Sequence, residues 1–99
     1  MRVAIENRED QITARLSGEI DHHTASVIRE TVDDSVIRAR PKKLILDFSG
    51  VTFTDSSGIA VVLGRYKLIK SISGTLECRG MNRQVKKLFD ISGINKFID

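Results

Sequence analysis

The sequence predicts an α/β domain with a mixed sheet of four to five strands and three or more helices. Apolar and polar residues alternate in two short segments near the N-terminus, which is typical of an antiparallel strand pair. Two later apolar segments each precede residues with helical spacing. Strands that alternate with helices in this order form parallel pairs. The 99 residues are enough for one small domain, so we expect a single domain over 1–99.

The first two strands are predicted to form an antiparallel hairpin. Val3 and Ile5 alternate with polar neighbours, and Arg8-Glu9-Asp10 has the composition of a turn. The second strand then carries apolar residues at every second position, which places them on one face of the sheet. They are Ile12, Ala14 and Leu16.

A first helix is expected from about Thr24, after the segment Gly18-Glu19-Ile20-Asp21. Asp21 and Thr24 are both residue types that cap helices, and the sequence leaves the choice open. The helix should end before Pro41, because the residue that precedes a proline avoids the helical region. Its apolar stripe comprises Ala25, Ile28, Val32 and Val36.

The middle of the chain predicts a buried strand, a loop and a second helix. The nearly unbroken apolar run over 44–48 is typical of a central parallel strand that is covered on both faces. We expect a loop over 49–54 and then a helix from Asp55-Ser56-Ser57-Gly58 to about Ile72. The apolar stripe of this helix comprises Ile59, Val62, Leu63, Tyr66 and Ile69.

After a break at Ser73-Gly74, a strand over 75–79 and a third helix complete the predicted elements. Cys78 would share a face with Leu76, so we interpret it as a core residue. Asn82 is placed to cap the third helix, Ser92-Gly93 should end it, and 94–99 is expected to be a short tail. The side of this helix that packs against the domain would carry Val85, Leu88 and Phe89.

Composition and charge argue against several classes of protein. The chain is 40% hydrophobic and 29% charged, which is typical of a folded globular domain. No apolar run approaches the roughly 20 residues of a membrane span, and the N-terminus lacks the apolar core of a signal peptide, so we expect a cytoplasmic protein. Residues 51–99 carry 8 basic and 4 acidic side chains. This bias favours an acidic protein partner, but it is too weak to indicate nucleic-acid binding.

Three loops are expected at the carboxyl edge of the parallel strands: 18–23, 49–57 and 80–82. Ligand and partner sites in open α/β sheets favour this edge. At the start of the second helix, Asp55, Ser56 and Ser57 have two interpretations. They cap the helix, or a hydroxyl there meets an anion such as phosphate at free backbone N–H groups.

The sequence gives little support for catalysis. Asp21-His22-His23 has metal-ligand residue types, but adjacent histidines diverge and no second cluster completes a site, so we expect no metal. A hydrolase would need Ser56 with His22 or His23, but the chain has no nucleophile elbow. Neither phosphate-binding glycine motif occurs, so we expect no cofactor.

The second helix carries another set of residues on a second face: Val61, Gly64, Arg65, Leu68 and Ile72. If these residues are exposed, they form a mixed apolar and basic strip that favours a partner-binding surface. If they are buried, they only pack against the sheet and a neighbouring helix. The sequence does not decide between these alternatives.

Several motifs together resemble the STAS family, in particular its anti-sigma factor antagonists in sporulation. The resemblance runs in order through nearly the whole chain. It differs at the end, since such proteins usually continue into a further C-terminal helix and this sequence stops at Asp99. The motifs are Gly18-Glu19-Ile20-Asp21-His22-His23-Thr24, Phe53-Thr54-Asp55-Ser56-Ser57-Gly58-Ile59, Gly64-Arg65-Tyr66-Lys67 and Val85-Lys86-Lys87-Leu88-Phe89-Asp90-Ile91-Ser92-Gly93.

The resemblance implies a non-enzymatic switch. In that family the unphosphorylated antagonist binds an anti-sigma factor that is also a serine kinase, which frees the sigma factor. The kinase phosphorylates the serine after the Asp with ATP, and a serine phosphatase reverses the step. By position the acceptor is Ser56, supported by Asp55, Ser57 and Gly58, with the Ser57 hydroxyl expected to cap the helix at the N–H of Ala60.

Partner contacts are expected at the same edge and along the second helix, and we expect the free protein to be a monomer. An alternative keeps the fold but makes the chain a STAS interaction module in another signalling assembly that is not phosphorylated. The residues expected to contact the partner are Asp21, His23, Ile59, Val61 and Arg65.

Overall fold

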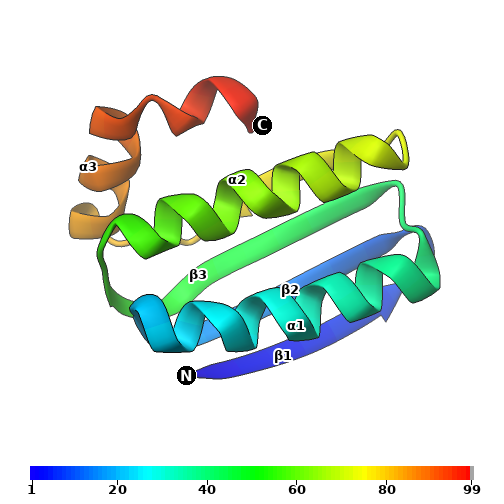
Figure 1. Ribbon diagram of the computed structural model, residues 1–99, viewed down its shortest axis with the longest axis horizontal. Coiled ribbons are helices and arrows are strands. Elements are labelled where there is room, and N and C mark those ends of the chain that lie inside the picture. The colour runs from blue at the N-terminus through cyan, green and yellow to red at the C-terminus, as the bar shows by residue number, and fades with distance from the viewer. Residues whose placement is uncertain (99) are drawn as a thin grey trace.

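The computed structural model describes residues 1–98 and contains four strands, three helices and one short 3₁₀ helix (Figure 1). Their order confirms the predicted one. None of the helices in this part of the chain is long and apolar enough to cross a membrane. The elements are β1 (Arg2–Arg8), β2 (Gln11–Ile20), α1 (His22–Ala39), β3 (Lys43–Thr54), α2 (Ser56–Ser71), β4 (Thr75–Arg79), α3 (Arg83–Ser92) and η1 (Ile94–Phe97).

The four strands form one mixed sheet in the order β1-β2-β3-β4. β1 and β2 are antiparallel, and β2, β3 and β4 are parallel, as predicted. The register aligns Ile12, Leu44 and Leu76 across the three parallel strands. Because β2 and β3 run in the same direction, the loops that follow them leave the sheet at one edge.

α1 and α2 lie side by side on the same face of the sheet (Figure 1). The core lies between these two layers, and its residues from α1 are the predicted Ile28, Val32 and Val36. α3 packs near the end of the sheet, where the rings of Phe89 and Phe48 meet edge to face with centroids 5.4 Å apart. The helices thereby fix one face of every strand as the apolar face.

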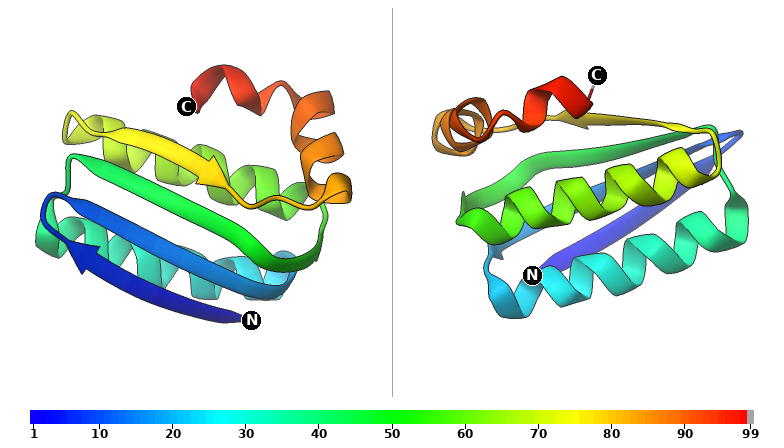
Figure 2. Two further views of the ribbon diagram at one scale, coloured as in Figure 1. Left: turned by 180° about the vertical axis from the view of Figure 1, so that it is seen from behind. Right: turned by 45° about the horizontal axis from the view of Figure 1, so that its top comes forward.

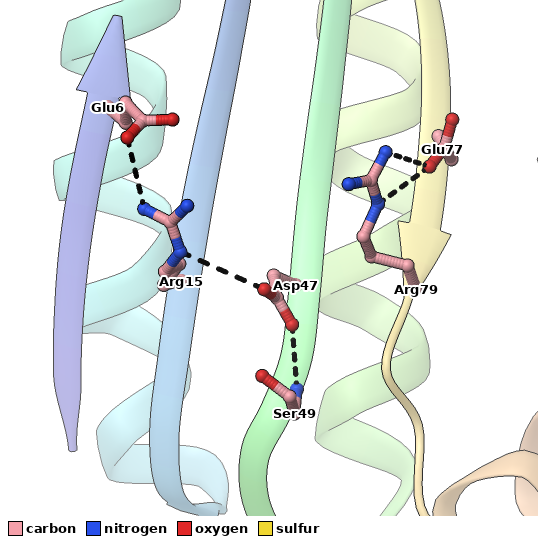
Figure 3. Close-up of polar contacts among 6 residues, drawn as sticks. All are labelled: Glu6, Arg15, Asp47, Ser49, Glu77 and Arg79. Atoms are coloured by element: carbon pink, nitrogen blue, oxygen red, sulfur yellow. Dashed lines mark hydrogen bonds and ion pairs between the residues drawn. The ribbon is translucent and has the colours of Figure 1, made fainter.

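No helix in residues 1–98 covers the opposite face of the sheet (Figure 2, left). This face carries charged side chains. Arg15 lies between two carboxylates, with its Nη1 3.5 Å from Glu6 Oε2 and its Nε 3.9 Å from Asp47 Oδ2 (Figure 3). The Asp47 carboxylate also accepts a hydrogen bond from the backbone N–H of Ser49. The predicted burial of the apolar run over 44–48 is confirmed at Leu44, Ile45, Leu46 and Phe48, although no helix in 1–98 lies on the second face of β3. Ile45 is 1% exposed but lies outside the core cluster, on the face of Asp47. Its register partners on β2 and β4 are Thr13 and Glu77, and Glu77 pairs with Lys43 and Arg79.

The loop predicted over 49–54 is also wrong, because β3 continues to Thr54. β2 likewise continues through Gly18 to Ile20, with register shifts after Arg15 and after Gly18. Gly50 makes the close approach of the two strands possible, since a Cβ atom there would lie 2.7 Å from the Cβ of Ser17. Glycines and serines in this region marked irregular pairing, not a loop.

α1 begins at His22, two residues earlier than predicted, because Asp21 and Thr24 cap it together. The Asp21 Oδ1 accepts a hydrogen bond from the N–H of Thr24 at 2.9 Å, and the N–H of Asp21 donates to Thr24 Oγ1 at 2.8 Å. This reciprocal capping box uses both residues that the sequence offered as alternatives. The helix ends at Ala39, before Pro41 as predicted.

The C-terminal elements follow the prediction closely. Asn82 caps α3, accepting from the N–H of Val85 at 2.9 Å, and α3 ends before Gly93, whose φ is 78°. The predicted tail instead forms η1 and buries Ile94, while Asp99 lies outside the described residues. Cys78 is partly buried and packs against the core, which agrees with the prediction, and burial raises the pKa of its thiol to about 12.

Candidate functional site

The helix starts that follow β2 and β3 lie next to each other. Ile20 pairs with Thr54 at the ends of the two strands, and the N–H of Asp55 donates to the carbonyl of Ile20 at 3.4 Å. Asn82 joins them, since its side-chain amide donates to the carbonyl of Val51 at 3.2 Å. The predicted convergence of three segments at the carboxyl edge is therefore confirmed.

Asp55 is the N-cap of α2. Its Oδ1 accepts a hydrogen bond from the N–H of Ser57 at 2.8 Å, and its backbone carbonyl accepts from the N–H of Gly58 at 3.0 Å. The prediction that Ser57 caps the helix is wrong. Serine and aspartate are both good caps, but the extended backbone that a cap requires falls at Asp55, and Ser57 is already inside the helix.

Ser56 is the first residue of α2, and its side chain is exposed. Its hydroxyl makes no hydrogen bond to any residue that the structure describes. The N–H groups of Ser57 and Gly58 are bonded to Asp55, so they are not free to bind an anion, as one interpretation of the sequence required. Ser56 thus presents a free hydroxyl to solvent beside a carboxylate.

Gly58 allows α2 to begin directly on the end of β3. A Cβ atom at this position would overlap Oγ1 of Thr54 and lie 3.1 Å from its Cβ. Thr54 is 4% exposed, and its hydroxyl donates to the carbonyl of Asp55 at 3.0 Å. The predicted supporting role of Gly58 has a steric basis in this contact, which sets the position of Asp55 and Ser56.

A groove of about 460 Å³ lies between the N-terminal halves of α1 and α2. We call it the α1–α2 groove. It reaches the helix start through Ser57, whereas Ser56 does not line it. The lining residues are His22, His23, Ala25, Ser26, Arg29, Ser57, Ala60, Val61 and Arg65.

An ion pair joins the two helices beside this groove. Arg65 Nε lies 2.9 Å from Asp33 Oδ1, although the angles are not those of a hydrogen bond, and the Arg65 side chain is only 7% exposed. Burial raises the pKa of Asp33 against the opposing charges of Arg65 and Arg29. Burial likewise lowers the pKa of Arg65 against the charge of Asp33, and the charge of Arg29 lowers it further. On the second face of α2, Val61 and Arg65 are therefore buried, whereas Gly64, Leu68 and Ile72 are half-buried.

The structure brings three of the five predicted partner-binding residues into the α1–α2 groove: His23, Val61 and Arg65. His23 is exposed, while Val61 and Arg65 are 3% and 5% exposed and so offer a partner only the groove-facing part of each side chain. Asp21 and Ile59 are half-buried outside the lining. Their contact with a partner stays a prediction.

Sequence reasoning missed Arg29 and Asp33. The sequence did show that Arg29 and Asp33 are four residues apart in the predicted first helix, which places them on one side of it. Their pairing with Arg65 is a tertiary contact that periodicity alone does not show.

His22 and His23 both line the groove, with ring centroids 6.1 Å apart. Ser56 does not, so the nucleophile and base of the hydrolase alternative are not brought together there. Within 1–98, no three His, Cys, Asp or Glu side chains are grouped as a metal site would require.

Comparison with known proteins identifies the family. The model of the STAS domain matches residues 2–99. The chain belongs to the STAS family. This STAS domain is 36% identical over 98 residues to an Anti-sigma F factor antagonist of Paenibacillus polymyxa, and the match covers 99% of the chain and 84% of the relative. It is 29% identical over 99 residues to an Anti-sigma-B factor antagonist of Bacillus subtilis, of which 89% is covered.

Solved structures confirm the fold of this STAS domain. It superposes on the anti-sigma factor antagonist SpoIIAA in its unphosphorylated form with a TM-score of 0.86 at 27% identity, covering 99% of this chain and 86% of that one. For the phosphorylated form of the Bacillus protein SpoIIAA the TM-score is 0.77 at 26% identity, with 99% and 89% covered. The predicted STAS fold and the resemblance to anti-sigma factor antagonists are thus confirmed.

Proposed function

We propose that this STAS domain is an anti-sigma factor antagonist whose binding is switched off by phosphorylation of Ser56. The observation that carries the proposal is the free, exposed hydroxyl of Ser56 directly after the capping Asp55. The relatives named anti-sigma factor antagonists, and SpoIIAA structures in unphosphorylated and phosphorylated forms, support it. The unphosphorylated domain binds an anti-sigma factor and thereby releases the sigma factor.

The anti-sigma factor is also the kinase in this proposal. It transfers the γ-phosphoryl group of ATP to Oγ of Ser56, whose proton is lost, and ADP leaves. A serine phosphatase then hydrolyses the phosphoserine and restores the hydroxyl. The domain itself acts as a binding module and kinase substrate without a cofactor, so its own residues position Ser56 and contact the partner.

The charge of the phosphate is sufficient to weaken binding strongly. A phosphoserine carries roughly −1.5 to −2 charges at neutral pH. One unit charge about 6 Å from a partner carboxylate costs about 3 kcal/mol at an effective dielectric constant near 20, which is about a hundredfold in affinity. The N–H groups of Ser57 and Gly58 are already bonded to Asp55, so these two donors do not compensate the charge of the phosphate, and the positive end of the helix dipole offsets only about 1 kcal/mol of it.

The wider setting follows from the same proposal. The chain acts as a single STAS domain over 1–99, in the cytoplasm and as a monomer when free, in a circuit of the kind that controls sporulation. The match of the domain model to 2–99 supports the domain boundaries.

Mass spectrometry after incubation with ATP and the kinase-type anti-sigma factor of the same organism tests this function. We expect one phosphate on the wild-type protein and none on Ser56→Ala, which should bind the anti-sigma factor constitutively. Ser57→Ala is the matched control, because it removes the neighbouring hydroxyl and leaves the acceptor. Phosphate on Ser57 would contradict the assignment. Tight binding with no phosphate on any serine would favour the alternative, a STAS module that is not phosphorylated.

A further inference from the structure

The α1–α2 groove has an uneven charge. Arg29 and Arg65 line it together with His22 and His23, and none of the lining residues is acidic. Its remaining walls are small or apolar side chains, those of Ala25, Ser26, Ser57, Ala60 and Val61. Such a surface has room for the stem of a side chain and attracts a negative charge at its end.

The two arginines of the groove have one carboxylate near them, and it pairs with Arg65 only. Asp33 lies 2.9 Å from Arg65 Nε, and its carboxylate makes no ion pair with Arg29, although Arg29 lies one turn earlier on α1. Arg29 is exposed and forms no ion pair with any residue that the structure describes. It is nevertheless close enough for its charge to lower the pKa of Arg65 and that of Asp33. One of the two guanidinium groups at the groove therefore lacks an anionic partner.

We propose that the α1–α2 groove receives the carboxylate of an Asp or Glu side chain of the anti-sigma factor, which pairs with Arg29. Asp33 holds Arg65 on the floor of the groove, so Arg65 acts as a positioning residue and adds positive charge. The inference rests on the proposed function and adds the chemistry of the partner residue. Charge complementarity selects this occupant, and Ser57 connects the groove to the helix start that carries the phosphoacceptor.

The proposal also links the groove to the switch. A phosphate on Ser56 places a second anion next to Ser57 at the end of the same groove. Its negative charge repels the incoming carboxylate. Phosphorylation then weakens partner binding through repulsion at the end of the groove.

The test compares the affinities of Arg29→Ala and Arg38→Ala for the kinase-type anti-sigma factor. Isothermal titration calorimetry at low and high salt measures them. Both arginines are exposed on α1, but Arg38 pairs with Asp34 at the other end of the helix, outside the groove. We expect Arg29→Ala to bind about tenfold more weakly at low salt, with a smaller salt dependence, and Arg38→Ala to bind within about twofold of wild type.

NMR of the arginine side chains provides a second readout that a purely structural role would not move. The Nε–H resonance of Arg29 should shift when the complex forms, and that of Arg38 should not. Equal affinities of Arg29→Ala and wild type, or equal losses in both variants, would overturn the proposal. The proposal would also be overturned if millimolar acetate alone shifted the Nε–H resonance of Arg29 as far as the anti-sigma factor does, because the groove would then be a site for small anions. If the wild-type protein does not bind the anti-sigma factor, the proposed function itself fails.

Discussion

Asp55 and Ser56 are neighbours in the sequence with separate tasks in the structure. The carboxylate of Asp55 bonds to the N–H of Ser57 and orients the first turn of α2. Ser56 takes no part in the capping and keeps its hydroxyl exposed. The sequence identified both residues through the motif but assigned the cap to Ser57, although Asp55 was also a possible cap. Both residue types cap helices, and only the backbone conformation decides which of them does so.

Replacing Asp55 by Ala should lower the free energy of unfolding by about 1 kcal/mol, because the N–H of Ser57 loses its acceptor. Ser57→Ala should change it by less than about 0.5 kcal/mol, since its hydroxyl caps nothing. Urea denaturation followed by circular dichroism measures both. The assignment of the cap would be wrong if Ser57→Ala proved the more destabilising of the two.

At the scale of elements, the helices were predicted more accurately than the strands. Apolar spacing, capping residues and Pro41 located α1, α2 and α3 to within about two residues. Strands β2 and β3 extend beyond their predicted ends because they pair with each other through register shifts around Gly18 and Gly50. Such pairing depends on a partner strand some 30 residues away, so no local pattern reveals it.

The junction of β3 and α2 depends on the contact between Gly58 and Thr54. Gly58→Ala would force a methyl group against Oγ1 of Thr54, which we expect to cost about 1–3 kcal/mol, while better helix propensity returns up to about 1 kcal/mol. The net effect should be destabilising by about 1–2 kcal/mol. In a Thr54→Ala background the overlapping atom is absent, so the same change should be close to neutral.

Urea denaturation of four proteins checks this coupling between Gly58 and Thr54, because it gives the free energy of unfolding of each. The wild type, the two single variants and the double variant form a double-mutant cycle. Additive effects would contradict the steric account of Gly58.

At the scale of the whole molecule, the fold separates stability from the switch. The core lies between the sheet and the two helices, whereas Ser56, the proposed phosphoacceptor, is exposed at the carboxyl edge of the sheet. The α1–α2 groove lies between the N-terminal halves of the two helices and shares Val61 with the core. The sequence predicted this edge from the order of the elements. It did not predict the groove, because Arg65 is buried through its pairing with Asp33 on another helix. The sequence alone could not decide whether this face of α2 is exposed.

This separation predicts that a negative charge on Ser56 removes binding and leaves the fold intact. Ser56→Asp should melt within a few degrees of wild type, because Ser56 is exposed and an acidic residue suits the first turn of a helix. Its affinity for the anti-sigma factor should fall by up to about a hundredfold, as estimated for one unit charge near a partner carboxylate.

Ser56→Asn is the matched control for that variant, since it has nearly the same shape as Asp and no charge. It should bind more tightly than Ser56→Asp by at least about tenfold if charge operates the switch. Equal losses in the two variants would instead make the size of the side chain decisive. A large drop in the melting temperature of Ser56→Asp would show that the helix start and the core are not separate. Calorimetric titration and thermal denaturation of the same two samples therefore decide whether phosphorylation acts by electrostatic repulsion on a domain that stays folded.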